Sequence, residues 1–124
     1  MSKLFFTFIS ILTLTFTTFA QEVETIAIAE SKSELAESKV SGEYTYILPT
    51  NITAEQVKKN AGYYTSYFTV GYDENSQKAT IKLMNDEKIS RMVMGRFLSS
   101  CGVRNLKVGE ETITLDKFME TYLK

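Results

Sequence analysis

The fold is decided by residues 68–83, which read FTVGYDENSQKATIKL. Residues 67–72 are rich in β-branched and aromatic side chains, which favour strands. The polar run 73–77 carries residues that are typical of a hairpin loop. Residues 78–84 then alternate polar and apolar side chains, so that the apolar ones share one face. This stretch therefore predicts a β-hairpin with one face turned toward a core.

A helix is predicted on each side of the hairpin. Thr53 and Gln56 form a capping box, because the Thr53 hydroxyl can accept from the Gln56 backbone N–H while the Gln56 side chain reaches back. After the hairpin, Asn85 can cap a second helix. Residues 89–101 repeat apolar side chains at the spacing of one helical face, and Gly102 is a suitable stop.

Further strands complete the domain. Residues 43–48 are rich in strand formers and end at Pro49, and residues 103–108 form another short strand. An edge strand at 112–114 precedes a closing helix. The order β-α-β-β-α-β predicts an α+β, ferredoxin-like sandwich with an appended C-terminal strand and helix. Two helices would cover one face of a four-stranded antiparallel sheet, and the other face would be solvated, covered by the closing helix or used for binding.

The N-terminus has the pattern of a secretory signal peptide. Lys3 supplies a positive charge, residues 4–16 form an apolar run, and small residues precede a cleavage site after Ala20. Residues 1–20 therefore predict an exported chain, secreted or periplasmic. The apolar run is too short for a membrane span, so none is expected in the mature chain.

The segment that follows differs in composition from the rest. Residues 21–41 are acidic and lack aromatic residues, glycine and proline, while residues 42–124 hold all the tyrosines. We expect residues 21–41 to be a polar tether, with the domain occupying 42–124. The alternative is a segment that becomes ordered on a partner.

Composition excludes several classes of function. The chain has 124 residues, a formal net charge of −1, one cysteine and no histidine. The absence of histidine removes imidazole catalysis and ligation, and a single cysteine removes any CxxC site. The balanced charge does not favour nucleic acid as a partner. No cofactor and no set of metal ligands is indicated.

Residues 68–83, with the helix at 89–102 and Val103 after it, resemble the second half of a heavy-metal-associated domain. The resemblance implies the ferredoxin-like fold. That family binds its metal through a CxxC motif before the first helix. The corresponding residues here, 49–56, contain no cysteine, histidine or methionine, so the metal site is carried over to no residue.

The tyrosines are the first candidate binding residues. Tyr44, Tyr46, Tyr63, Tyr64 and Tyr67 lie close together in the sequence. Tyrosines on strands commonly pack a half-buried sheet, but tyrosine is also enriched at contact surfaces. If the face that carries Tyr44 and Tyr46 is not under the helices, it forms a binding platform.

Cys101 is the second candidate. It is either a small buried hydrophobe or the half of an intermolecular disulfide that would make a dimer. The C-terminus of a helix does not lower a thiol pKa, which argues against a catalytic thiolate. On the same helix we expect Met92 in the core, and Met94 and Arg91 exposed to solvent.

These observations favour a non-catalytic binding or interaction module, whose partner is a protein or an envelope component. One alternative is a degenerate soft-metal domain of the copper type, using methionine and Cys101, because thioethers favour Cu(I). A second alternative is a small enzyme that works without histidine, through a carboxylate or tyrosine acid or base.

Overall fold

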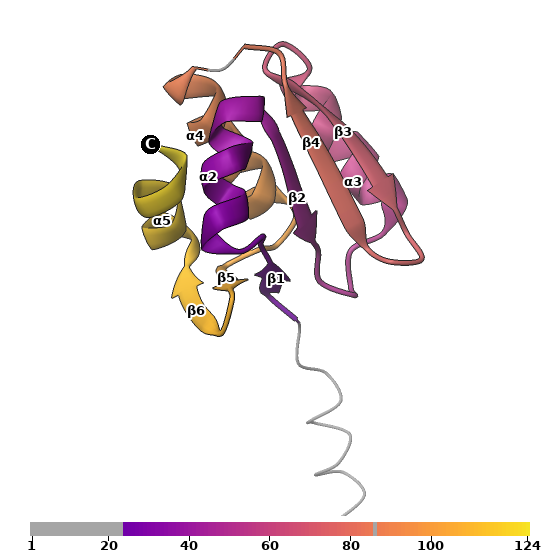
Figure 1. The fold of residues 1–124 in the computed structure, drawn as a ribbon. Coiled ribbons are helices and arrows are strands. Elements are labelled where there is room, and N and C mark those ends of the chain that lie inside the picture. The colour runs from indigo at the N-terminus through magenta and orange to yellow at the C-terminus, as the bar shows by residue number, and fades with distance from the viewer. Residues whose placement is uncertain (1–23, 86) are drawn as a thin grey trace, which may run out of the picture.

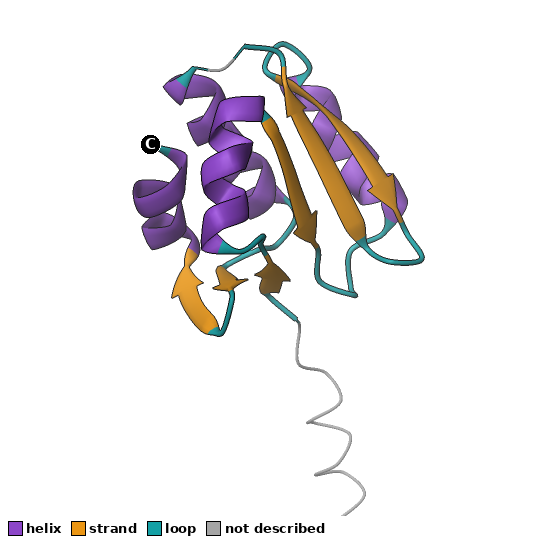
Figure 2. Ribbon diagram, in the orientation of Figure 1, coloured by secondary structure: helices purple, strands orange, loops and turns teal. Residues whose placement is uncertain are grey.

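The computed structural model describes residues 24–85 and 87–124 as one layer of helices against one β-sheet (Figures 1 and 2). The expected signal peptide at 1–20, with its cleavage site, lies outside the described residues. The strands are β1 (Ile26–Ile28), β2 (Glu43–Ile47), β3 (Phe68–Asp73), β4 (Lys78–Leu83), β5 (Asn105–Val108) and β6 (Glu111–Thr114). The helices are α2 (Lys32–Ser41), α3 (Ala54–Ala61), α4 (Lys88–Ser100) and α5 (Leu115–Phe118). Short helical turns at Gly62–Tyr64 and Met119–Leu123 extend α3 and α5.

The sheet confirms the α+β class and corrects its details. It has six strands in the order β3-β4-β2-β1-β5-β6. Neighbours are antiparallel except β1 and β5, which are parallel, so the sheet is mixed. We expected four antiparallel strands with one appended strand. The difference arises because β1 lies between β2 and β5 and separates two strands that a ferredoxin-like sheet would pair. None of the described helices is long and apolar enough to cross a membrane.

The segment for which we expected a tether contributes β1 and α2. Ala27 is buried in β1, and Leu35 of α2 joins the core. A capping box between Ser31 and Glu34 begins α2, and Gly42 ends it with φ of +76°. Sequence periodicity missed both elements because β1 has only three residues and α2 buries only Leu35 and Ser38.

Glu30 joins β1, α2 and β2. β1 is too short to follow β2 further than the pair Ile28–Ile47, so the Thr45 N–H has no strand partner on that side. The Glu30 carboxylate accepts this N–H at 2.6 Å and also accepts the Ser38 hydroxyl at 2.9 Å. One side chain thereby replaces the missing ladder bond and fixes α2 against β2.

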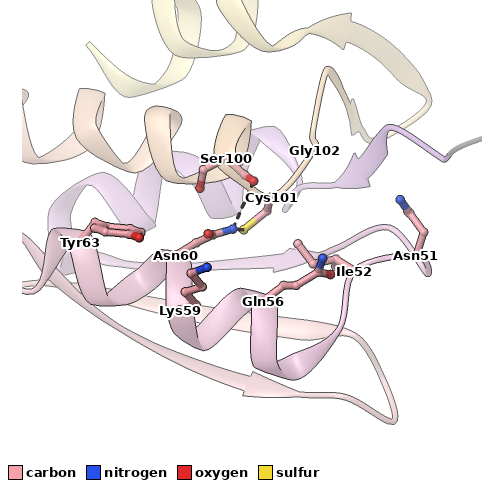
Figure 3. A pocket seen from close by; sticks show the side chains of 9 residues that line it. All are labelled: Asn51, Ile52, Gln56, Lys59, Asn60, Tyr63, Ser100, Cys101 and Gly102. Carbon is pink, nitrogen blue, oxygen red and sulfur yellow. Dashed lines mark hydrogen bonds between the residues drawn. The ribbon is translucent and has the colours of Figure 1, made fainter.

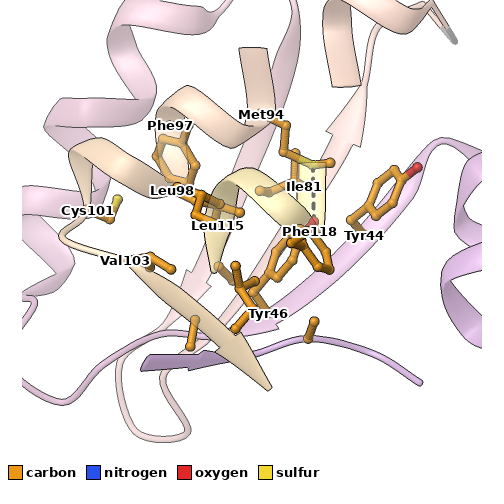
Figure 4. Packing of buried hydrophobic residues seen from close by; sticks show 14 of the residues in the cluster. Tyr44, Tyr46, Ile81, Met94, Phe97, Leu98, Cys101, Val103, Leu115 and Phe118 are labelled. Carbon is orange, nitrogen blue, oxygen red and sulfur yellow. Dashed lines mark hydrogen bonds between the residues drawn. The ribbon is translucent and has the colours of Figure 1, made fainter. Parts of the chain in front are cut away.

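The core lies between the helices and one face of the sheet (Figure 4). Buried side chains of all four helices join alternate residues of the strands in one cluster. Phe97 of α4 is central, because its ring meets those of Phe68 and Tyr64 edge-on, with centroids 5.7 and 6.3 Å away. The largest buried side chains are Tyr44, Tyr46, Phe68, Phe97, Phe118, Leu35 and Ile81.

The hairpin and the Thr53 capping box are confirmed, but α4 differs from its expected orientation. Met94 is fully buried while Met92 is only partly buried. Arg91 is buried as well, and its Nε donates to the Leu123 carbonyl at 2.9 Å. The reason is that α4 packs against the sheet and also against the C-terminal turn, so two sides of the helix are covered.

The expected cap of α4 is also wrong. Glu87 is the N-cap residue, and no side-chain hydrogen bond caps this helix among the described residues. Asn85 instead accepts the Glu87 N–H through its backbone carbonyl at 2.9 Å. The C-terminal stop is as expected, because α4 ends at Ser100 and Gly102 follows with φ of +87°.

Candidate binding site

A polar pocket of about 470 Å³ opens between α3 and the C-terminal end of α4 (Figure 3). Three parts of the chain form it: the loop before α3, one side of α3 with its extension, and the turn after α4. Its lining residues are Asn51, Ile52, Gln56, Lys59, Asn60, Tyr63, Ser100, Cys101 and Gly102.

Asn60 fixes the geometry of the pocket. Its Nδ2 donates to the Ser100 carbonyl at 3.1 Å and lies 3.8 Å from Cys101 Sγ. The carbonyl of Ser100 belongs to the end of α4, where helical carbonyls lack partners within the helix. Asn60 therefore ties α3 to α4 and holds the wall of the pocket in place.

Gln56 is fixed from the other end of α3. Its Oε1 accepts the Thr53 N–H at 3.0 Å in the capping box. Because this bond uses the oxygen, the amide group of Gln56 keeps its N–H donors for the pocket. Amide donors from two successive turns of α3 therefore line the same wall.

The charge of the pocket favours a ligand that accepts hydrogen bonds. Lys59 is the one charged side chain among the nine that line it. Burial raises the pKa of the Cys101 thiol, although hydrogen bonds with Asn60 and Ser100 act in the opposite direction. The thiol is therefore protonated at neutral pH and is a poor nucleophile.

The structure places Tyr44 and Tyr46 away from any surface. Both are fully buried on the face of β2 that lies under the helices, so the condition for a binding platform is not met. The Tyr46 hydroxyl lies 3.8 Å from Met94 Sδ, and the Tyr46 ring packs edge-on against Phe118. Burial raises the pKa of Tyr46 well above its ordinary value, with a further contribution from Tyr44 and Glu30.

The other three tyrosines separate into two roles. Tyr64 stacks on Phe68 with ring centroids 5.8 Å apart, and Tyr67 is partly buried against the core. Tyr63 is 72% exposed and lines the polar pocket. Cys101 is 4% exposed and forms no disulfide. Of the six residues selected from the sequence, the pocket therefore brings together Tyr63 and Cys101.

Sequence reasoning missed the amides that define the pocket. Gln56, Lys59, Asn60 and Tyr63 follow the spacing i, i+3, i+4, i+7, which places them on one side of a helix. That spacing indicates a polar stripe on α3 and was present in the sequence. Nothing in the sequence indicated that the turn after α4 would lie against it.

The opposite face of the sheet is a second exposed surface. Ile26 and Ile28 of β1 are 46% and 49% exposed, and neither belongs to the buried cluster or packs against it. The remaining exposed side chains of this face are mixed in character: Glu43, Thr69, Asp73, Lys78, Lys82, Lys107, Thr112 and Thr114.

Within the part of the chain that the structure describes, no three His, Cys, Asp or Glu side chains are grouped as metal ligands would be. Comparisons with protein-family models, with curated proteins and with solved structures each find no match to this chain. The function is therefore argued from the geometry alone.

Proposed function

We propose that this chain is a non-catalytic binding module, and that the polar pocket between α3 and α4 holds its ligand. The proposal depends mainly on the lining of the pocket. An ammonium group, three side-chain amides and two hydroxyls surround it, and none of the nine lining residues is a carboxylate. Acid–base and nucleophilic chemistry need a group with a suitable pKa, and the one thiol that lines the pocket, Cys101, is buried and protonated.

The ligand class follows from the same groups. The Lys59 ammonium supplies a charge, and Asn51 and Gln56 offer amide N–H donors. Donors around one cation suit a carboxylate, because charge-assisted hydrogen bonds are stronger than neutral ones. Tyr63 at the rim adds an exposed ring that can pack against the rest of the ligand. We therefore expect a peptide or a small molecule that ends in a carboxylate.

The wider setting of the proposal comes from the sequence. The composition of residues 1–20 supports export, and the partner would then be an extracellular or envelope component. The order β3-β4-β2, followed beyond β1 by β5, supports a ferredoxin-like core into which β1 is inserted. Such folds serve many functions, so the ligand is inferred from the pocket alone.

The test is an NMR titration of the ¹⁵N-labelled chain with N-acetylated dipeptides, each as the free acid and as the C-terminal amide. We expect the acids to shift the resonances of Asn60, Tyr63 and Gly102, and the amides to bind more weakly. Lys59→Met should weaken binding of the acids about tenfold, the value for loss of one charge-assisted bond. Lys39→Met, on the exposed side of α2, is the matched control.

Three results would contradict the proposal: shifts that map outside the pocket, equal binding of acids and amides, or no binding of any acid. Chemical conversion of a bound dipeptide would contradict the non-catalytic part alone.

A further inference from the structure

β3 is one edge of the sheet and leaves a row of main-chain groups without a strand partner. The Met84 N–H donates to the Tyr67 carbonyl at 2.8 Å, which fixes the phase of the β3–β4 ladder. In an antiparallel ladder, hydrogen-bonded and non-hydrogen-bonded residue pairs alternate. Counting from the bonded pair Tyr67–Met84, Thr69 and Gly71 therefore direct their N–H and C=O groups toward β4. Val70 and Tyr72 direct theirs outward, away from the sheet.

An apolar pocket of about 290 Å³ adjoins this edge, between β3 and α3. The side chains of Val70 and Tyr72 form its β3 side, because they point toward the helices. The residues that line it are Ala54, Val57, Lys58, Ala61, Val70 and Tyr72. The Tyr72 hydroxyl oxygen is buried and has no hydrogen-bond partner among the described residues.

We propose that β3 binds an extended peptide segment of a partner protein by strand addition. The peptide pairs with the outward main-chain groups of Val70 and Tyr72, as a new edge strand does. One of its apolar side chains enters the pocket between β3 and α3. A carboxylate on the peptide lies at Lys58.

Charge favours such a peptide over a second copy of this chain. Lys58 is the one charged side chain that lines the pocket. In a symmetric dimer formed edge to edge through β3, the two α3 helices would approach each other, and the Lys58 side chains with them. Like charges placed together destabilise a contact, whereas an acidic peptide complements it.

The composition of β3 also favours strand addition. Natural sheets protect their edges with lysine, proline or very short strands. β3 has six residues, FTVGYD, with neither lysine nor proline. The opposite edge, β6, has four residues and leads directly into α5, so it offers less to a partner.

This site goes beyond the proposed function and does not depend on it. The polar pocket uses Gln56, Asn60 and Tyr63, whereas the apolar pocket uses Val57 and Ala61. These two sets lie on different sides of α3, so each site can be altered without the other.

The test begins with a phage-displayed library of random dodecapeptides, selected on the whole chain. We expect the enriched peptides to combine an apolar side chain with a nearby aspartate or glutamate. Hydrogen exchange then identifies the site. In the free chain the Val70 and Tyr72 amides should exchange rapidly, and addition of a synthetic copy of an enriched peptide should slow both.

Two variants, each with a matched control, sharpen the test. Val70→Pro removes an outward N–H and no ladder bond to β4, so the chain should fold and bind the peptide at least about tenfold more weakly. Thr112→Pro removes the equivalent outward N–H at β6 and should leave binding unchanged. Ala61→Leu fills the apolar pocket from α3 and should also weaken binding, whereas Ala36→Leu, on the exposed side of α2, should not.

The proposal is overturned if no peptide is enriched, or if the enriched peptides protect amides elsewhere. It is also overturned if Val70 and Tyr72 become protected with rising concentration of the chain alone, because that result identifies a second copy as the occupant. If Val70→Pro does not fold, the pair Ala61→Leu and Ala36→Leu decides the outcome.

Discussion

The two faces of the sheet are formed by the same short strands but differ in burial. In β1, Ala27 is fully buried, while Ile26 and Ile28 on either side are about half exposed. Side-chain size alone would predict the reverse arrangement. The neighbours of β1 decide it, because Ala27 is paired with Leu106 of β5 and therefore shares its face. Register, and not hydrophobicity, determines which residues of a short strand enter the core.

The contrast extends along β2. Tyr44 and Tyr46 are fully buried under the helices, while Thr45 and Ile47, which alternate with them along the strand, are only partly covered. The buried face thus concentrates aromatic rings, and the open face carries β-branched and charged side chains. Substitutions on the two faces should therefore differ greatly in their cost.

The largest effect is expected at the centre of the covered face. Phe97→Ala should lower the free energy of unfolding by about 3–5 kcal/mol, because it removes a fully buried ring that contacts Phe68 and Tyr64. In so small a domain this loss can unfold the chain. Ile89→Ala, on the exposed side of the same helix, is the control and should cost little. Urea denaturation measures both, and equal costs would contradict the assigned orientation of α4.

Ala27→Leu tests the covered face where β1 enters it. The added methylene groups meet a fully buried site, and such overpacking typically costs about 1–3 kcal/mol. Urea denaturation followed by circular dichroism measures the loss. A neutral or stabilising result would show that β1 does not hold Ala27 against the core, and would remove β1 from the centre of the sheet.

Tyr46, on the covered face, should make the stability of the folded chain fall at high pH. Burial raises the pKa of its hydroxyl above the unfolded value near 10.0. Below pH 10 both states are protonated and this group has no effect. Above pH 10 the unfolded state loses the proton first, so stability falls by about 1.4 kcal/mol per pH unit until the folded pKa is reached. Burial of the Cys101 thiol acts in the same direction from about pH 9.

Tyr46→Phe removes this dependence. The variant should lose a little stability at pH 7, with the weak contact to Met94, and should be the more stable chain above about pH 11. Thermal unfolding from pH 7 to pH 12 measures both curves. Parallel curves for the two chains would show that Tyr46 is accessible to water.

Strong local signals made part of this fold predictable. The hairpin of β3 and β4 alternates clearly, and Thr53 with Gln56 forms the capping box that the sequence indicates. Both depend on residues close together in the chain. β1 was not predictable, because three residues carry too little periodicity and its place is set by contacts with β5, far along the chain.

The candidate site shows the same division. Cys101 could be anticipated as a buried small side chain, and the polar stripe of α3 was present in the sequence. The contact that unites them is the bond from Asn60 to the Ser100 carbonyl, forty residues later. No local pattern encodes such a contact. The burial of Tyr44 and Tyr46 was likewise decided by which face the helices cover.

The smallest effect is expected on the open face. Ile28→Thr keeps a β-branched side chain at a site that is 49% exposed, so it should change stability by no more than about 0.5 kcal/mol. The same urea titration, run at several concentrations of the chain, measures the effect. A loss above 1 kcal/mol that grows with concentration would mean that a second copy covers Ile28. A large loss independent of concentration would instead mean that another part of the same chain lies over β1. The open face of the sheet would then be covered at β1, and the difference in burial between the two faces would not include this strand.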